Sequence, residues 1–411
     1  MTFLPEVREL TTAQEQLLHD TQIDEDEPGS ILRDFATMLA FIDEGSVTLT
    51  ETHLLPLKVL APLNERLTTP LTIGLQRPSL KSYPPIEGLY LLARASELTV
   101  IDETGKKPHL WLNPEAYASW QTLNPTERYF TLLENWVLRG EPEILGENGN
   151  LFDFAGPLSG WHGFFSKVPE QGITIRHGTE DERSLRYFPG LRNLALLQMF
   201  GFAVIHDDPP VEGEGWQIGT IERTDLGDAV LPLLVQHFST LLETTEVLPP
   251  PDLVPIGQLQ PTFQPYFPAW QRNLVIPGHG FTDGVYLFRV ALDDEIWRRI
   301  AIPATLTLDD LTHVIMDAFA FDHEHLSEYI YRSRAGVEQR IRSMTDGEEI
   351  ETDMVRVGDL PLQPGASMVL HYDLLYDWLF ALSLEQIEPA EGTIRKPAVI
   401  EQHGTAPDQY A

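Results

Sequence analysis

Two imidazole side chains with carboxylates beside them form the most chemically suggestive cluster of the sequence. His323 and His325 stand in the run Asp322-His323-Glu324-His325. Imidazole and carboxylate groups are good ligands for zinc, nickel or manganese. The spacing misses the His-Glu-x-x-His pattern of helical zinc sites, because Ser327 stands where the second imidazole is needed. We therefore favour a polar turn with one hydrogen-bonded histidine, expect no cofactor, and keep a divalent metal on His323 and His325 as the alternative.

A pair of aspartates gives a second candidate site. Asp373 and Asp377 lie in the run Tyr372-Asp373-Leu374-Leu375-Tyr376-Asp377-Trp378. Two carboxylates in one pocket could perform acid–base chemistry or hold a metal, so the candidate catalytic residues are Asp373, Asp377 and His325. We favour the structural alternative, in which Asp373 caps a turn and Trp378 packs in the core.

Trp297, Arg298 and Arg299 could form an anion clamp or a stacking platform. In a strand, Arg298 and Arg299 point to opposite faces, whereas Trp297 and Arg299 share a face. A cation–π or ion-pair role within the fold is therefore favoured over ligand binding. The candidate ligand-binding residues are Trp297, Arg299, His325, Asp373 and Trp378.

A pattern of strands and one helix between Tyr286 and Leu384 must position these residues. Alternating apolar residues predict strands at 286–292 and 296–302, and further strands follow at 329–331, 367–372 and 378–384. Thr307 caps a helix whose apolar residues recur at helical spacing as far as Phe319. A hairpin, a packed helix and further strands predict an α+β domain of the β-grasp kind.

The same residues carry a resemblance to a known family. The run Ile296-Trp297-Arg298-Arg299-Ile300, the helix, and the run Phe321-Asp322-His323-Glu324-His325-Leu326 resemble the root-inducing plasmid ORF-3-like family, also described as transposon-passenger, resolvase-like proteins. The tail from Pro397 to Tyr410 and the segment from Phe263 to Trp270 are similar to its longer members. The resemblance implies a fold for residues 260–411 and no established activity.

This chain departs from the family at both candidate sites. The family typically reads His-Leu-His around His325, and Ser327 replaces one imidazole here. The later turn usually reads Tyr-Asp-Phe-Gly-Asp-x-Trp, and this chain has Leu375 for the glycine and Tyr376 for the second aspartate. Whatever chemistry the family motif supports, the resemblance implies that it is altered in this chain.

Upstream, the order of helices and strands predicts two winged-helix-like modules, at residues 1–122 and 123–245. The helix, strand, loop and strand that begin at Leu91 recur from Leu196, as in a divergent internal repeat. Residues 141–185 fit neither pattern. A proline-rich linker at 246–280 then leads to the α+β domain at 281–411, and its aromatic side chains are expected to lie in a groove of a neighbouring domain: Phe263, Tyr266, Phe267 and Trp270.

Composition separates the possible function classes. The 28 basic residues against 62 acidic residues give a formal net charge of −34, a field that repels nucleic acid and anionic membranes. The absence of cysteine excludes disulfides, thiol nucleophiles and cysteine-ligated metals. Neither a signal segment nor an apolar stretch long enough to cross a bilayer is found, so a cytoplasmic protein is expected.

We interpret the chain as a non-catalytic binding protein whose winged-helix-like modules dock a protein partner, or which holds a small ligand. One alternative is a nucleic-acid-associated accessory factor of mobile elements, which the resemblance suggests. The other is a metal-dependent hydrolase that would use His323, His325, Asp373 and Asp377.

Overall fold

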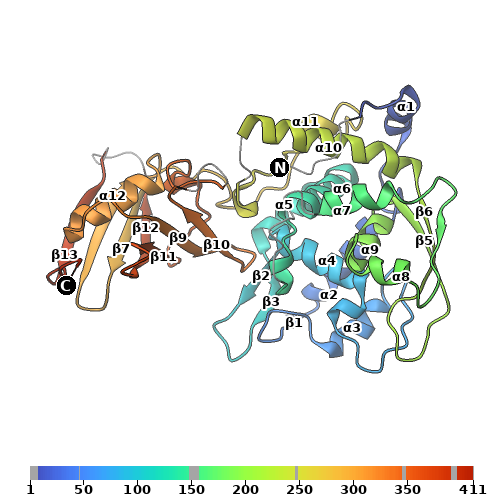
Figure 1. The fold of residues 1–411 in the computed structure, drawn as a ribbon, viewed down its shortest axis with the longest axis horizontal. Coiled ribbons are helices and arrows are strands. Elements are labelled where there is room, and N and C mark those ends of the chain that lie inside the picture. The colour runs from blue at the N-terminus through green and yellow to red at the C-terminus, as the bar shows by residue number, and fades with distance from the viewer. Residues whose placement is uncertain are drawn as a thin grey trace. The chain divides into compact units, whose positions relative to one another are not determined.

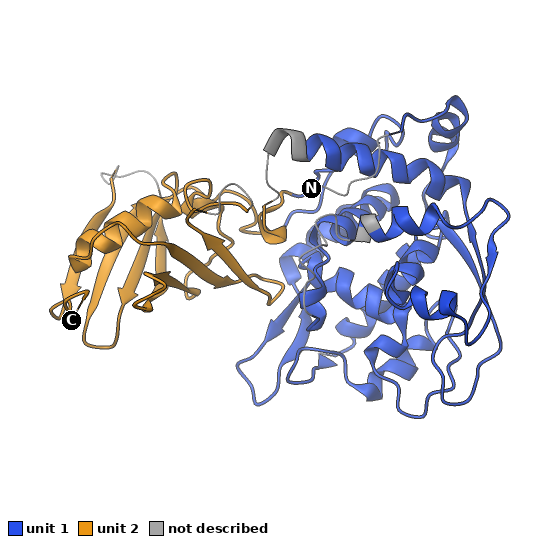
Figure 2. Ribbon diagram, in the orientation of Figure 1, with its two compact units in different colours: residues 1–243, 256–276 blue, residues 244–255, 277–411 orange. Residues whose placement is uncertain are grey.

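The chain folds into two compact units, each described here by itself (Figure 2). The computed structural model describes residues 8–45, 47–147, 157–245, 249–344, 349–389 and 396–410. Unit 1 comprises residues 1–243 and 256–276, and unit 2 comprises residues 244–255 and 277–411. Both modules predicted upstream, 1–122 and 123–245, fall largely within unit 1, while the predicted linker is divided between the two units.

Unit 1 is mainly helical, with two small sheets (Figure 1). Asparagine caps begin two consecutive helices: the side chains of Asn113 and Asn124 accept hydrogen bonds from the amides three residues on. The elements are α1 (Thr12–Asp20), α2 (Ile31–Asp43), β1 (Val47–Thr48), α3 (Leu57–Asn64), α4 (Pro84–Ala95), β2 (Thr99–Asp102), β3 (His109–Leu112), α5 (Pro114–Thr122), α6 (Pro125–Glu134), α7 (Pro157–Phe165), β4 (Ile173–Thr174), α8 (Glu180–Leu185), α9 (Leu191–Met199), β5 (Ala203–Asp207), β6 (Ile218–Arg223), α10 (Asp225–Thr245) and α11 (Gln260–Phe263).

The sheets have the strand orders β1-β3-β2 and β4-β6-β5. Each includes one hairpin of the expected repeat, β2–β3 and β5–β6, and the preceding helices α4 and α9 pack against each other. A Cβ added at Gly88 of α4 would lie 2.8 Å from the side chain of Leu196 in α9, so the two helices approach closely there. The winged-helix assignment itself stays a prediction.

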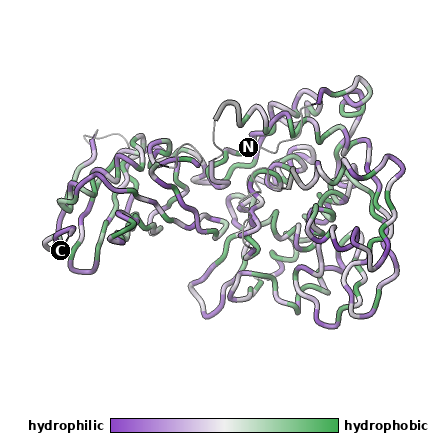
Figure 3. The backbone as a smooth tube through the Cα atoms, viewed as in Figure 1, coloured by the Kyte–Doolittle hydropathy of each residue, from purple (hydrophilic) through white to green (hydrophobic). Residues whose placement is uncertain are grey.

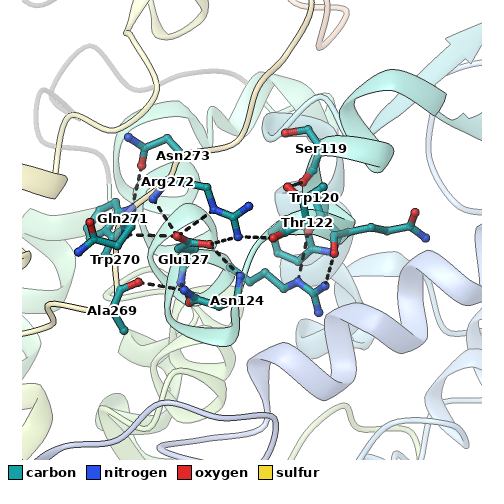
Figure 4. Close-up of polar contacts among 12 residues, drawn as sticks. Ser119, Trp120, Thr122, Asn124, Glu127, Ala269, Trp270, Gln271, Arg272 and Asn273 are labelled. Atoms are coloured by element: carbon teal, nitrogen blue, oxygen red, sulfur yellow. Dashed lines mark hydrogen bonds and ion pairs between the residues drawn. The ribbon is translucent and has the colours of Figure 1, made fainter.

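The segment 256–276, which we call the strap, packs on α6 of unit 1 (Figure 4). The ring of Phe130 lies at 4.7–5.1 Å between centroids from Phe263, Phe267 and Trp270, all of which are buried. Glu127, one turn earlier on α6, accepts hydrogen bonds from the strap backbone. Burial of the linker aromatics, which the sequence leads us to expect, is observed for Phe263, Phe267 and Trp270, whereas Tyr266 is only partly buried.

Unit 2 is an antiparallel sheet with one long helix across a face (Figure 1). The strand order is β10-β9-β11-β12-β7-β8-β13. The predicted hairpin, helix and further strands occur in that order, which confirms the α+β class. The elements are β7 (Val285–Ala291), β8 (Trp297–Pro303), α12 (Leu308–Phe319), β9 (Ser327–Arg332), β10 (Glu338–Arg342), β11 (Ser367–Tyr372), β12 (Trp378–Glu388) and β13 (Ala398–His403).

The core of unit 2 lies between α12 and one face of this sheet. Thr307 caps α12 through a reciprocal pair of hydrogen bonds with Asp310, as the sequence predicts. Leu311 and Ile315 of the helix are buried with Phe288 and Phe380 of the sheet. The residues between them in each strand therefore point to the other face, which we call the open face. Hydrophobic and hydrophilic segments accordingly alternate along these strands (Figure 3).

None of the helices in the described part of the chain combines the length and the apolar character that crossing a membrane requires.

Candidate functional site

The candidate site lies in unit 2, where the chain leaves α12 and enters β9. The helix ends at Ala320, which adopts a left-handed conformation with φ of 58° and so turns the chain sharply. The next residues form a short polar segment, and Asp322 and His325 are both on it. β9 and its neighbour β11 then bring the turn after β11 beside this segment, with the Asp373 amide donating to the carbonyl of Leu326 at 3.0 Å.

His325 is held on both sides of its ring. Its Nδ1 lies 3.3 Å from Oδ2 of Asp373, a carboxylate whose side chain is only 3% exposed. Its Nε2 lies 2.8 Å from the hydroxyl of Tyr410 and 3.3 Å from Oδ1 of Asp322. Both nitrogens thus face acceptors, and the ring is oriented by groups from three separate segments of the chain. We call Asp322, His325, Asp373 and Tyr410 the His325 cluster.

Asp373 is fixed by the turn that it begins. Its backbone has φ of 54°, in the left-handed region, and its Oδ1 accepts hydrogen bonds from the amides of Leu375 and Tyr376 at 3.2 and 3.3 Å. Its carbonyl accepts from the amide of Asp377 at 2.7 Å. The expectation that Asp373 caps a turn is confirmed, and its second oxygen is left to face His325.

The tail after β13 supplies the outer wall of the cluster. The Tyr410 hydroxyl donates a hydrogen bond to Asp322, and this bond holds the pKa of the Asp322 carboxyl below its usual value. The same bond raises the pKa of the Tyr410 phenol to about 12, so the phenol stays protonated near neutral pH. Gln409 is buried beside it and accepts from the Asp322 amide at 2.8 Å. The tail is thereby tied to the segment that carries His325.

The two predicted metal ligands face different groups. His323 pairs with Asp317 at 3.0 Å and stacks on His313 at 5.1 Å, whereas His325 faces Asp322 and Asp373. Across the described residues, no three histidine, aspartate or glutamate side chains are arranged to hold a metal ion. The candidate metal site on His323 and His325 is therefore not assembled in this structure.

Asp377 belongs to a separate cluster on the open face. Its Oδ1 lies 2.8 Å from Nε2 of His371, and Nδ1 of the same ring lies 3.4 Å from Oε1 of Glu328. Glu328 is also paired with Arg340 at 2.8 Å. Asp373 and Asp377 thus face different histidines and do not converge as an acid–base pair.

Trp297 and Arg299 lie together on the open face, away from His325. The Arg299 guanidinium is 5.8 Å from the Trp297 ring centroid and pairs with Glu385 at 2.6 Å. Arg298 points to the helix side, as strand alternation predicts, and donates to the Ala318 carbonyl. These contacts give Trp297 and Arg299 a role within the fold, consistent with the favoured structural interpretation.

Trp378 lies on the core side, near the tail. Its ring packs against Phe321 at 4.8 Å, and its Nε1 donates to the Gln409 carbonyl at 3.3 Å. The five predicted ligand-binding residues therefore do not meet in one site: His325 contacts Asp373, Trp297 contacts Arg299 elsewhere, on the open face, and Trp378 lies behind the tail that closes the His325 cluster. Tyr410 was not predicted as a partner of His325. The only signal for it in the sequence is the similarity of the tail, residues 397–410, to the family.

Comparison with known proteins agrees with the resemblance seen in the sequence. Residues 285–409 match the plasmid pRiA4b ORF-3-like protein family. That match includes Asp322, His325 and Asp373 of the His325 cluster and ends one residue before Tyr410; it confirms the predicted resemblance of the C-terminal unit. A crystal structure of a protein of unknown function from Methanosarcina mazei Go1 is 22% identical, covers 30% of this chain and 71% of its own, and has a TM-score of 0.28. Among curated proteins, none matches the chain.

Proposed function

We propose that unit 2 is a non-catalytic protein-binding module whose contact surface surrounds the turn between β11 and β12. The observation that carries this proposal is the exposure of consecutive large side chains at the turn: Leu374, Leu375 and Tyr376 are 51%, 87% and 51% exposed. Contiguous exposed apolar groups on a folded protein mark interaction sites. For unit 1, the proposal keeps a docking role for the winged-helix-like modules, which the acidic composition supports.

Further exposed side chains extend this surface beyond the turn. Leu326 accepts a backbone hydrogen bond from Asp373, and the Tyr410 ring lies 5.4 Å from that of Tyr376. Leu379 is exposed on the first residues of β12. We call this set the turn surface: Leu326, Leu374, Leu375, Tyr376, Leu379 and Tyr410.

The absence of catalysis is supported by the way the turn departs from the family pattern. Leu375 and Tyr376 occupy the places of a glycine and an aspartate. The remaining aspartates face different histidines, so they do not form a paired-carboxylate site. Leu375 and Tyr376 thus add exposed apolar surface where the family has a glycine and a carboxylate, and such a surface suits protein binding better than catalysis.

Charge defines the kind of partner that would fit. Asp322 and Asp377 lie at the margins of the turn surface with side chains 37% and 73% exposed, and the whole chain carries a net charge of −34. A partner surface that places apolar side chains on Leu375 and basic side chains around them would complement both features. The proposed partner is therefore a protein with a basic, partly apolar contact surface.

Site-specific photocrosslinking tests the proposal. A photoreactive phenylalanine analogue at position 375 is expected to capture a distinct protein species, whereas the same analogue at Met354, which is 53% exposed, is not. The captured species is then purified and its affinity measured by calorimetry. Leu375→Asp is expected to weaken binding by at least about tenfold, and the matched Met354→Asp to leave it unchanged.

Three outcomes would overturn this function. They are capture of the same species at both positions, capture of a second copy of this chain alone, and an affinity that Leu375→Asp does not change. Weaker binding at high salt is expected as well, because the charged margin of the interface would be screened.

A further inference from the structure

An open hollow lies at the C-terminal end of α12, on the side of the His325 cluster formed by the tail. Its volume is about 700 Å³, within the usual range for small-ligand sites. The lining comes from the last turn of α12 at residues 318–320, from Arg298 and Asp322, and from the tail at 405–410. All of these belong to unit 2.

Arg298 is a buried cation that lines this hollow without a carboxylate partner. It is 4% exposed and stacks over the Phe319 ring at 4.6 Å. Its Nε donates to the Ala318 carbonyl at 2.9 Å, and its Nη1 donates to the carbonyls of Trp297 and His403, both at 2.8 Å. Among the described residues, no Asp or Glu pairs with Arg298, and its Nη2 makes no hydrogen bond. Burial lowers the pKa of this guanidinium, as expected for a cation without a counter-ion.

Acidic groups line the same hollow. Asp322 is held ionised by its hydrogen bond from Tyr410, and Asp408 is exposed on the tail. A hollow lined by a buried cation and by acids favours ligands that carry both a negative and a positive group over ligands of one charge. A dianionic ligand such as phosphate would meet Asp322, Asp408 and the acidic field of the chain, whereas a ligand with both a carboxylate and an ammonium group would satisfy both signs.

We propose that this hollow binds a small amino carboxylate, an amino acid in its zwitterionic form, with its carboxylate on Arg298 and its ammonium group on Asp322 and Asp408. The planar guanidinium suits a carboxylate, and the free Nη2 donors supply the bonds that the protein leaves unmade. The side chain of the ligand would lie along the apolar last turn of α12. This site shares Tyr410 and the marginal Asp322 with the docking surface proposed above, and its other residues are different.

Calorimetry with the purified full chain tests this assignment, and the probes are the free proteinogenic amino acids. At least one is expected to bind. The amide of that amino acid, which lacks the carboxylate, and its N-acetyl form, which lacks the ammonium group, are each expected to bind at least about tenfold more weakly, because each loses a charge-assisted contact.

Variants locate the site on the protein. Arg298→Met keeps an unbranched side chain over Phe319 and is expected to abolish binding. It also loses the hydrogen bonds to backbone carbonyls, so it is expected to lower the stability of unit 2. Asp408→Asn is exposed and provides the safe second variant, with an expected weakening of about threefold to tenfold. Asp309→Asn, on α12 at its opposite end, is the matched control and is expected to change nothing. Leu375→Asp is also expected to leave amino-acid binding intact, which separates this test from that of the docking surface.

The assignment is overturned if none of the amino acids binds at millimolar concentration. It is equally overturned if the amide binds as tightly as the free acid, or if Asp408→Asn and Asp309→Asn behave alike.

Discussion

Asp373 combines a left-handed backbone with a buried carboxylate that makes contacts in two directions. Its Oδ1 accepts from two amides of its own turn, while its Oδ2 faces His325. Asparagine tolerates the left-handed region and keeps one side-chain acceptor. Alanine has no side-chain acceptor and is disfavoured in the left-handed region. The side chain is therefore needed for the turn as much as for the orientation of the imidazole.

Replacing Asp373 separates these contributions. Asp373→Ala is expected to destabilise unit 2 by about 1–3 kcal/mol, because the turn amides lose their acceptor and the backbone conformation becomes less favourable. Asp373→Asn is expected to cost less. Chemical denaturation of both variants checks the order, and equal stability of alanine and wild type would contradict the described turn.

Ala320 offers a cleaner test of backbone conformation. It occupies the left-handed position that ends α12, with φ of 58° and ψ of 37°, and glycine is preferred there. Ala320→Gly is expected to raise the free energy of unfolding by about 1 kcal/mol. Ala318→Gly, two residues earlier inside the helix, should lower it by about the same amount. Thermal denaturation of the pair measures the contrast, and a destabilised Ala320→Gly would contradict the described helix end.

At the scale of elements, the strap and α6 are joined by two buried glutamates on one face of the helix. Glu127 accepts from the amides of Gln271 and Arg272 at 3.2 and 2.8 Å and from the Arg272 side chain (Figure 4). Glu134, about two turns later, accepts from the amides of Gly257 and Leu259 at 2.6 and 2.9 Å. Each carboxylate satisfies strap amides that would otherwise be buried without acceptors.

Glu127→Gln is expected to loosen the strap. An amide NH₂ would replace an oxygen that now faces only donors, so a buried donor would meet other donors. We expect a loss of about 1–3 kcal/mol and faster hydrogen exchange at the amides of Gln271 and Arg272. Glu115→Gln, in the first turn of α5, is the exposed control. Unchanged exchange in the strap would show that Glu127 does not hold it.

Glu134 gives unit 1 a specific dependence on pH. Burial raises the pKa of this carboxyl to about 7, against the opposing effect of the strap amides and of Arg139. Because the folded pKa exceeds the unfolded value, the contribution of this group to stability is complete below the unfolded pKa. It is lost as the pH rises to about 7, and further alkalisation changes nothing more.

The measurement is the difference in unfolding free energy between wild type and Glu134→Gln at several pH values. Wild type is expected to lose on the order of 3 kcal/mol relative to the variant between about pH 4 and pH 7, because the variant cannot ionise there. A difference that stays constant over this interval would show that folding does not shift the pKa of this carboxyl.

At the scale of the whole molecule, net charge governs which macromolecules can approach. A formal charge of −34 opposes association with a phosphate backbone, and each contact with DNA needs a basic residue to displace counter-ions. Several arginines of unit 2 pair with acids of the fold: Arg299, Arg340, Arg342 and Arg356. These observations weigh against the accessory factor of mobile elements that the resemblance suggests.

Electrophoretic mobility shift with duplex DNA decides this point. No retardation is expected at low salt, where electrostatic attraction would be strongest. Retardation that persists at physiological salt would restore the nucleic-acid alternative. A basic DNA-binding protein of similar size serves as the positive control under the same conditions.

The sequence by itself determined the order of the helix and of five strands in unit 2, the cap of α12 at Thr307 and the turn at Asp373. It also placed Arg298 and Arg299 on opposite faces. These features depend on side-chain periodicity and on hydrogen bonds between residues that are close together in the sequence. Two edge strands, β10 and β13, escaped prediction for different reasons. β10 has a single apolar residue, Ile341, among charged and polar ones, and the apolar residues of β13 are consecutive rather than alternating.

Only the tertiary structure decided which candidate residues meet. His325 contacts Asp373 because β9 pairs with β11 in one register, and it contacts Tyr410 because the tail returns from β13 to the end of α12. The same folding sends Asp377 to His371 and leaves Arg298 without an acid among the described residues. Strand register and chain return join residues that are far apart in sequence, and no local pattern encodes those distances.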